Sequence, residues 1–387
     1  MKEIKEVAAA LERQEYKQAA KLLKQLQKEN PQNLWVKLYI GRWYEETDKL
    51  ESAEKTYRKL LQDATNPQVM TQARQGLQRI ETLEKHRQQE AIARAKSDPR
   101  NAEPALLILE PINKENKHKE NKHKENRQEA IPNFARIMNV DPYTARMQLQ
   151  NSGWRIYRIG PVGELVIYSE QLLKVGIPAF SVAIASLKKV QVFRVRNLQS
   201  VKPQITVVCE NESDEKGSLT FNWSEVTAKV EGLLPIFIDA MDYDPRRQSQ
   251  KFRRKEMTQD YANICDLHLP ERQAIVRFCD RAYDFKQGLE IHPLDPKINT
   301  TENTSPAITE STNRIKWNSL IDLLNLHLSK IKVYSNFTPF GETTTRDYTQ
   351  LLGRLKSYVD IERKEESLWD QAFQLYSLLA FLKNRES

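Results

Sequence analysis

Apolar positions near the N-terminus recur with a fixed spacing of 34 residues. Ala19 and Ala53 are separated by this distance, and so are Leu23 and Tyr57. A period of this length, with small residues where helices cross and large residues around them, predicts stacked pairs of helices. Stacking is required because a single helix pair cannot bury its apolar face alone.

The second copy of the pattern predicts two helices, at about residues 34–47 and 51–63. Gly41 lies inside the first of them, where glycine costs about 1 kcal/mol relative to alanine. This cost indicates that the next helix crosses closely at Gly41, with Ala53 as the small residue at the crossing. A third helix is expected at about residues 67–85, followed by a polar stretch that forms a cap or a projecting helix.

This register resembles the tetratricopeptide repeat (TPR) family. The first copy departs from the family pattern at Val7 and Ala10, where the family has glycine and tyrosine. The resemblance covers residues 1–96 and implies an α-solenoid of two repeats plus a capping helix. Two repeats are fewer than most solenoids need for independent stability. The block is therefore expected to form a homo-oligomer or to lean on the rest of the chain.

The resemblance also implies a function. TPR domains are usually binding surfaces, so the groove formed by the first helix of each repeat is expected to hold a peptide or helix of another protein. Basic side chains in this groove would suit an acidic peptide or a terminal carboxylate. TPR geometry implies that the groove-facing residues are Lys2, Lys5, Lys37 and Arg42.

Composition shifts divide the rest of the chain. Residues 97–133 are expected to be a disordered low-complexity linker, because Lys114–His118 is repeated in tandem and has no apolar residue to bury. Residues 134–296 begin as strand–helix–strand and continue with strands, which favours an α+β module. A second linker at 297–313 precedes a helical segment at 314–387. The sequence thus predicts a multidomain α and α+β protein: an N-terminal TPR-like α-solenoid, a central mixed α+β sheet module and a C-terminal helical segment.

Periodicity also places individual elements. In the central module one helix is expected at about 163–175. The strands expected there are 154–159, 177–184, 189–196, 204–209, 219–223 and 229–238. The C-terminal helices are expected at 315–331, 346–361 and 364–383. The stretch 154–196 loosely resembles small ferredoxin-like ligand-sensing or signalling modules, and no residue role is carried over from them.

The charge and the cysteines limit the function classes. The formal net charge is +8, and residues 134–210 carry +6 of it, which is a mild attraction to polyanions and not a nucleic-acid signature. No apolar run approaches the ~18–20 residues of a membrane span, and the first helices are too charged for a signal peptide. The 3 cysteines are too scattered for a disulfide framework, so a reducing cytoplasm is the expected location.

A helix-turn-helix-like segment at 134–150 offers a different function. Asp141 as N-cap and Pro142 at the first helical position are good start signals for its second helix. Arg136 and Arg146 would contact phosphate or base edges, which would make the protein a DNA-binding regulator. The second helix is short, however, and carries only Arg146 as a strong reader of DNA. A helical preface that packs on the following sheet is the favoured interpretation.

A second alternative is a small-ligand-sensing site at the start of the helix at 163–175. The turn Gly160–Gly163 leads into a helix N-terminus, whose free N–H groups bind anions. Arg155 and Arg158 lie just upstream of this turn. Arg155, Arg158 and Gly163 therefore form a candidate anion site for a phosphorylated or carboxylated ligand. The competing interpretation is a plain turn between strand and helix.

No group of residues predicts catalysis. Cys265 and His268 are spaced like half of a zinc knuckle, but no second short pair follows, so neither a metal nor a cofactor is expected. They would also make a poor hydrolase dyad. The basic run from Arg246 to Lys255 follows aspartates that screen it, so it is expected to be a charged surface loop. We expect a cytoplasmic interaction or scaffold protein that is not an enzyme, with protein partners favoured over nucleic acid.

Overall fold

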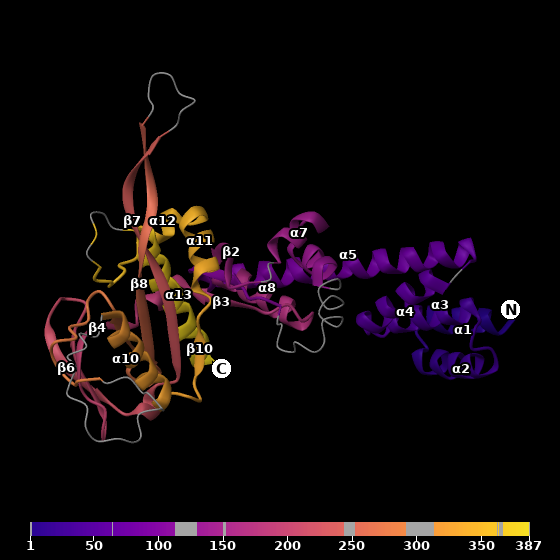
Figure 1. Cartoon of the computed structure of the whole chain (residues 1–387). Coiled ribbons are helices and arrows are strands. Elements are labelled where there is room, and N and C mark those ends of the chain that lie inside the picture. Colours follow the sequence, from indigo (N-terminus) through magenta and orange to yellow (C-terminus); the bar gives the residue numbers. More distant parts are fainter. Residues whose placement is uncertain are drawn as a thin grey trace, which may run out of the picture. The chain divides into compact units, whose positions relative to one another are not determined.

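The computed structural model describes residues 2–63, 65–112, 130–149, 152–243, 252–291, 313–361, 363 and 367–386. The chain divides into two compact units, Met1–Ser97 and Asp98–Ser387, which are called unit 1 and unit 2 below. Unit 1 is helical, whereas unit 2 contains both sheets and helices (Figure 1). The predicted order of helical repeats, α+β region and C-terminal helices is therefore confirmed.

The described part of unit 1 contains two helix pairs followed by one long helix. These helices are α1 (Lys2–Glu12), α2 (Tyr16–Glu29), α3 (Leu34–Glu46), α4 (Leu50–Asp63) and α5 (Pro67–Ser97). Gln14 and Asp48, which lie in the turns inside the two pairs, both have φ of 60°. Because these residues are 34 positions apart, the repeat in the sequence is also a repeat of backbone conformation.

Asparagine side chains cap the N-termini of α3 and α5. Asn33 accepts hydrogen bonds from the N–H groups of Trp35 and Val36 at 3.0 and 3.4 Å. Asn66 caps α5 in the same way. Such a cap is worth about 1 kcal/mol to a helix. From this start α5 continues as one helix of 31 residues to Ser97, so the polar stretch that was predicted after the third helix is part of the same helix.

Tyr57 of α4 is buried between α3 and α5. A Cβ atom added at Gly41 would lie 2.5 Å from Cε1 of its ring, and one added at Gly76 would lie 2.5 Å from Cε2. Both positions therefore need glycine for the ring to fit. The close approach predicted at Gly41 exists, and the atoms nearest to Gly41 are those of the Tyr57 ring, while Ala53 is buried in the same core. The sequence prediction missed Gly76, which follows Gly41 by 35 residues.

The first sheet of unit 2 has three antiparallel strands in the order β2-β1-β3. β1 (Pro104–Leu109) lies between β2 (Arg155–Pro161) and β3 (Ala179–Ala183). The expectation of a disordered linker across 97–133 is therefore wrong for these 6 residues, of which all but the first are buried. The tandem repeat itself falls in 113–129, outside the described residues.

Helices cover one face of this sheet. They lie at 130–138, in α7 (Pro142–Gln148) and in α8 (Val162–Lys174). Their apolar side chains share a core with alternate residues of β1, such as Leu107, whereas Leu106 belongs to the core on the opposite face. This alternation is what a strand buried on both faces requires.

The second sheet, as far as the structure describes it, has seven strands in the order β10-β7-β8-β9-β4-β5-β6. The strands are β4 (Gln191–Ser200), β5 (Ile205–Glu210), β6 (Lys216–Phe221), β7 (Ala228–Tyr243), β8 (Phe252–Leu269), β9 (Ala274–Cys279) and β10 (Lys332–Tyr334). β7 and β8 form a long hairpin that extends past the rest of the sheet (Figure 1). β8 and β9 were not predicted, and the surface loop expected up to Lys255 is wrong from Phe252 onward because that segment is strand.

Helices from the C-terminal part cover both faces of the second sheet. α10 (Asn313–His327) packs on one face, and α11 (Phe337–Asp347) and α13 (Leu368–Glu386) pack on the other. α13 shares one core with residues of both sheets, so the segment predicted at 314–387 is not a separate body but part of unit 2. The helix predicted at 346–361 is wrong beyond Leu352, where the short α12 (Thr349–Leu352) ends.

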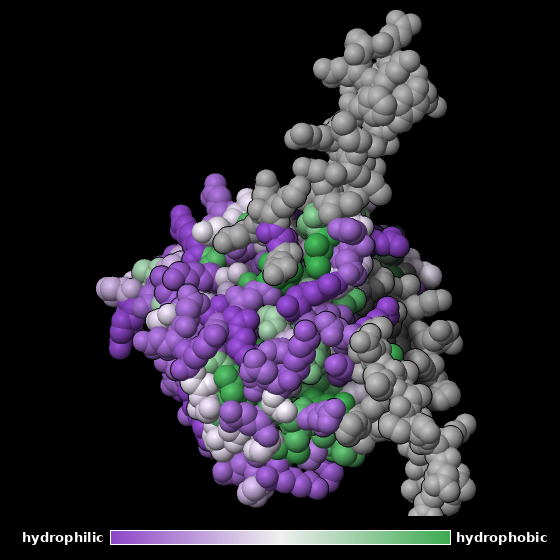
Figure 2. Space-filling view, turned by 60° about the vertical axis from the view of Figure 1, so that its left-hand side comes forward, coloured by the Kyte–Doolittle hydropathy of each residue, from purple (hydrophilic) through white to green (hydrophobic). Residues whose placement is uncertain are grey.

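The side of the molecule on which β4 and β6 lie is mostly hydrophilic (Figure 2). Hydrophobic side chains appear there in small separate patches, which is ordinary for a folded protein. Within the described ranges, no helix combines the length and the apolar character that crossing a membrane requires.

A buried ion pair joins β8 to β9. Asp266 and Arg277 stand opposite each other, and the guanidinium donates two hydrogen bonds to the carboxylate at 2.8 and 2.6 Å. The side chains are 0% and 1% exposed. Gln374 and Ser377 of α13 complete the cluster, since Arg277 donates to Gln374 at 2.7 Å and Ser377 donates to Asp266 at 2.6 Å. The cluster therefore ties α13 to the sheet.

His268 lies beside this ion pair and is also fully buried. Its Nε2 atom is 3.1 Å from the Ser377 hydroxyl oxygen, and its ring meets the edge of Phe381. Burial lowers the pKa of His268 to about 4, against an opposing effect of the Asp266 charge, while Arg277 lowers it further. The imidazole is therefore neutral in the folded protein at pH 7.

Acid is expected to destabilise unit 2 through His268. The unfolded imidazole gains a proton below its ordinary pKa of 6.5, whereas the folded one stays neutral down to about 4. The unfolded state binds more protons in this window, so the free energy of unfolding falls as the pH falls. Between pH 7 and 5 the loss should be about 2 kcal/mol larger for the wild type than for His268→Gln. Denaturant unfolding at both pH values measures this, and equal losses would contradict it.

Candidate protein-binding surface

α3 is the central helix of unit 1. It packs against α1 and α2 on one side and against α4 and α5 on the other. Every residue from Leu34 to Glu45 is buried or half-buried, although three of these residues are charged. The directions in which these side chains point decide which of them are available to a partner.

The faces of α3 are assigned by what they contact. Val36, Ile40 and Trp43 pack in the core of the first helix pair, and the Trp43 indole N–H donates to the Tyr16 carbonyl at 3.0 Å. Leu38 packs in the core with α4 and α5. These contacts occupy the two sides of the helix.

One further stripe remains on α3. Trp35, Tyr39, Arg42 and Glu46 follow one another at spacings of four, three and four residues and therefore share one face. Trp35 and Tyr39 pack at the edges of the two cores, so the stripe lies between them. It combines aromatic surface with a guanidinium group.

Lys37 is five residues from Arg42 and lies on the opposite side of α3. Its ammonium group donates to the Gln32 side chain at 3.1 Å and is 3.9 Å from a carboxylate oxygen of Asp63, at the end of α4. The expectation that Lys37 lines the groove is therefore not met. Residues five apart on a helix do not share a face, which the sequence alone could have shown.

The other two predicted lysines lie on α1. Lys5 is exposed and stands 34 residues before Tyr39, so the repeat places it on the same side as the α3 stripe. Lys2 stands 34 residues before Val36, which faces sideways into a core. The register therefore places Lys2 beside the stripe and not on it, and its side chain lies outside the described residues.

α5 continues the same surface. Because Gly76 follows Gly41 by 35 residues, the equivalents of the α3 stripe are Met70, Arg74, Leu77 and Glu81. Glu81 forms an ion pair with Lys85 at 2.8 Å. The two stripes together with Lys5 are called the open face of unit 1 below. Within the described part of the chain, Lys5, Arg42 and Arg74 form no ion pair, so the open face carries three unpaired cations.

A hydrogen-bonded group fixes α5 against α3. Arg79 donates to the Glu45 carboxylate at 2.6 and 2.9 Å, and the Tyr57 hydroxyl donates to the same carboxylate at 2.8 Å. Burial, and then the Glu45 charge, raise the pKa of Tyr57 far above its ordinary value, so the hydroxyl stays protonated and donates. This group holds the two halves of the open face in a fixed relation.

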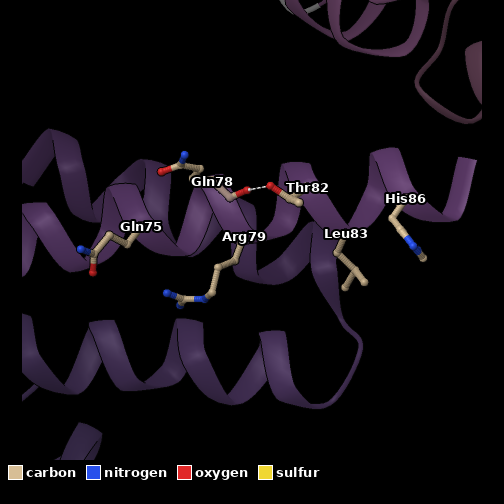
Figure 3. Close-up of a pocket in the computed structure, with 6 residues that line it drawn as sticks. All are labelled: Gln75, Gln78, Arg79, Thr82, Leu83 and His86. Atoms are coloured by element: carbon tan, nitrogen blue, oxygen red, sulfur yellow. Dashed lines mark hydrogen bonds between the residues drawn. The ribbon is translucent and has the colours of Figure 1, made fainter. Parts of the chain in front are cut away.

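The hollow of about 580 Å³ in Figure 3 lies on a different flank of α5. It is lined by Gln75, Gln78, Arg79, Thr82, Leu83 and His86. Gln75 and Arg79 are the equivalents of Ile40 and Tyr44, which pack inside the repeats. Polar residues at these two positions end the stack, as capping helices of solenoids do. The hollow is therefore the capped end of unit 1 and not its groove.

Comparison with known proteins agrees with this geometry. Residues 10–75 match the family model of the tetratricopeptide repeat. Unit 1 contains tetratricopeptide repeats. The match spans α2, α3, α4 and the first part of α5, and so includes the α3 stripe and the contact of Tyr57 with Gly41, and it ends one residue before Gly76. No curated protein and no solved structure matches the chain. The TPR assignment indicates a protein-interaction role for unit 1.

The helix-turn-helix-like segment packs on the first sheet of unit 2. Phe134 and Met138 from the helix at 130–138 and Ala145 from α7 lie in one core with β1. The arginines are on different helices, with Arg136 half-buried and Arg146 exposed. The geometry matches the interpretation as a helical preface, and DNA binding stays an untested prediction.

The three residues of the predicted anion site do not converge. Arg158 is 3.5 Å from the Glu164 carboxylate and packs over the Tyr168 ring. Gly163 is buried in the first turn of α8. The charge of Arg155 acts instead near Asp347, whose pKa is lowered first by its hydrogen bond with Arg346 and less by Arg155. The carboxylate of Glu164 occupies the position beside Arg158 that an anionic ligand would need.

Cys265 and His268 both lie on β8 but on opposite faces. Residues three apart on a strand point in opposite directions. Cys265 is buried in the core under α10, whereas His268 meets Ser377 and Phe381 of α13. The two side chains therefore form neither half of a zinc site nor a catalytic dyad with each other.

Proposed function

We propose that the open face of unit 1 binds an acidic segment of another protein and that the chain works as an interaction or scaffold protein without catalysing a reaction. The observation that carries this proposal is the position of Arg42. It lies on the α3 stripe between Tyr39 and Glu46, and Arg42 forms no ion pair within the described part of the chain. A guanidinium group in this setting binds a carboxylate through two parallel hydrogen bonds.

The flanking side chains support the same class of partner. Lys5 and Arg74 add positive charge at the two ends of the surface, and Trp35, Tyr39, Met70 and Leu77 add apolar area. Aromatic side chains and arginine supply most of the binding energy in typical protein interfaces. The preferred partner segment therefore combines an acidic residue with apolar neighbours, in a helix or an extended peptide.

Charge reversal at single positions of α3 tests whether a partner binds at the stripe or at another face of this helix. The full chain is used as bait in its native cell extract, and captured proteins are quantified by mass spectrometry for wild type, Arg42→Glu and Lys37→Glu. Arg42→Glu should reduce capture of the specific partner about tenfold or more, because a charge-assisted hydrogen bond is worth about 1.5–3 kcal/mol. Lys37→Glu is the matched control, since its ammonium group points to α4. Equal losses for the two variants would exclude the stripe as the binding site.

A further inference from the structure

β7 has a short stretch of free edge beside β10. Pairing with β10 covers Ala228–Val230 and ends at Tyr334, after which the chain turns into α11. Farther along β7, the Pro235 carbonyl accepts a hydrogen bond from Arg363 at 3.2 Å, and proline has no N–H group to offer. The free stretch is therefore limited to Glu231–Leu233.

The N–H and carbonyl groups of Leu233 form no hydrogen bonds with β8. Its partner on β8 is Asn263, whose carbonyl accepts a hydrogen bond from the Asp280 N–H on the β9 side at 3.0 Å. The backbone N–H and carbonyl groups of Asn263 therefore point to β9. Leu233 and Asn263 are thus a non-hydrogen-bonded pair, and the N–H and carbonyl groups of Leu233 point away from β8 toward the edge of the sheet. No described strand pairs with these groups, and free edge groups of this kind accept an added strand.

A hollow of about 520 Å³ lies over β7 and β8 beside this free edge. Glu231, Gly232 and Leu233 line it from β7, Asn263, Ile264 and Cys265 line it from β8, and Ser335 and Thr338 line it from the chain after β10. α10 contributes the other wall through Trp317, Asn318, Ile321 and Asp322. Behind the edge, a Cβ atom at Gly232 would lie 2.6 Å from the Phe373 ring, so that side is closed. The hollow is therefore on the α10 side of the sheet, next to the outward N–H and carbonyl groups of Leu233.

The charged residues that line the hollow are acidic, which favours a basic occupant. Glu231 and Asp322 line it, and none of its lining residues is basic. Lys229 is 2.7 Å from Glu231 and only 3% exposed, so it offsets that carboxylate from within the protein. The exposed carboxylate of Asp322 remains, and a lysine or arginine side chain complements it.

We propose that the free edge of β7 binds an extended segment of another polypeptide. The segment adds a short strand beside Glu231–Leu233 and places a basic side chain against Asp322. Ile321 and the edge of Trp317 provide an apolar wall for a neighbouring side chain. This surface belongs to unit 2 and takes a basic partner, so it is independent of the open face of unit 1.

The test uses the full chain and the synthetic peptide acetyl-Thr-Val-Lys-Val-Thr-amide, with binding measured by calorimetric titration. Two further versions carry N-methyl groups either on the lysine or on both valines. Alternate N–H groups of a strand point to opposite sides. One methylated version should therefore bind at least about tenfold more weakly than the parent, and the other should bind like the parent. Equal binding of all three peptides, or no binding at millimolar concentration, would overturn the proposal.

Two variants locate the binding site. Asp322→Asn should weaken the lysine peptide about fivefold and leave a version with glutamine in place of lysine unchanged. Leu233→Pro, which repeats the chemistry of Pro235 two residues away on the same edge, should abolish binding of both. Glu170→Gln on α8 removes an exposed carboxylate elsewhere and should change nothing. Binding that is insensitive to Asp322→Asn would show that the charge assignment is wrong.

Discussion

Asp266→Asn is expected to lower the free energy of unfolding of unit 2 by about 3–5 kcal/mol. The substitution preserves the size of the side chain but leaves the buried Arg277 guanidinium without its carboxylate. Breaking one half of a buried ion pair is costly because the remaining charge has no water to solvate it. Urea unfolding followed by circular dichroism at pH 7 measures the loss.

A surface ion pair provides the control for this experiment. Asp260 pairs with Arg281, and the side chains are 58% and 41% exposed. Asp260→Asn should therefore cost less than about 1 kcal/mol. Similar losses for the two variants would mean that the buried cluster does not stabilise the contact between α13 and the sheet.

Gly41→Val is expected to destabilise unit 1 by about 3 kcal/mol. Helix propensity alone predicts a slight gain, since valine is a better helix former than glycine. The added side chain, however, would begin 2.5 Å from the Tyr57 ring, which is held on its other edge by Gly76. Thermal or denaturant unfolding of unit 1 in the full chain gives the sign of the effect, which separates packing from propensity.

The same contact predicts non-additivity. In a Tyr57→Leu background the ring is gone, so adding Gly41→Val should cost much less than it does in the wild type. Gln75→Val, next to Gly76 but on the exposed flank of α5, is the matched control and should change stability by less than about 1 kcal/mol. Additive losses for the double variant would contradict the packing described for Tyr57.

The repeats could be predicted from the sequence because their signal is local and periodic. Ala19 and Ala53, or Leu23 and Tyr57, fix the register without knowledge of any distant contact. Gly76 was missed because it follows Gly41 by 35 residues and so falls outside the period of 34. The helical phase of Lys37 opposes that of Arg42, so the two side chains cannot both face the predicted groove, and that Arg42 lines it stays a prediction.

The sheets were harder to predict because their strands pair over long distances. β1 is a short apolar run whose partners begin 46 residues later, after a low-complexity segment that dominated the composition of the region. β8 mixes charged and apolar residues, and its pairing with β7 and β9 is what identifies it as a strand. The free edge of β7 could not be predicted at all, because it depends on where β10, Pro235 and Arg363 meet in space.

Hydrogen–deuterium exchange of the full chain, with and without a captured partner, tests the central claim most directly. Binding at the open face should slow exchange in α3 around Trp35–Glu46 and in the Met70–Glu81 part of α5. Exchange in α2 and in α4 should stay as it is in the free protein. Protection confined to α2 and α4, with the α3 stripe unchanged, would contradict the proposal that the open face of unit 1 is the binding surface.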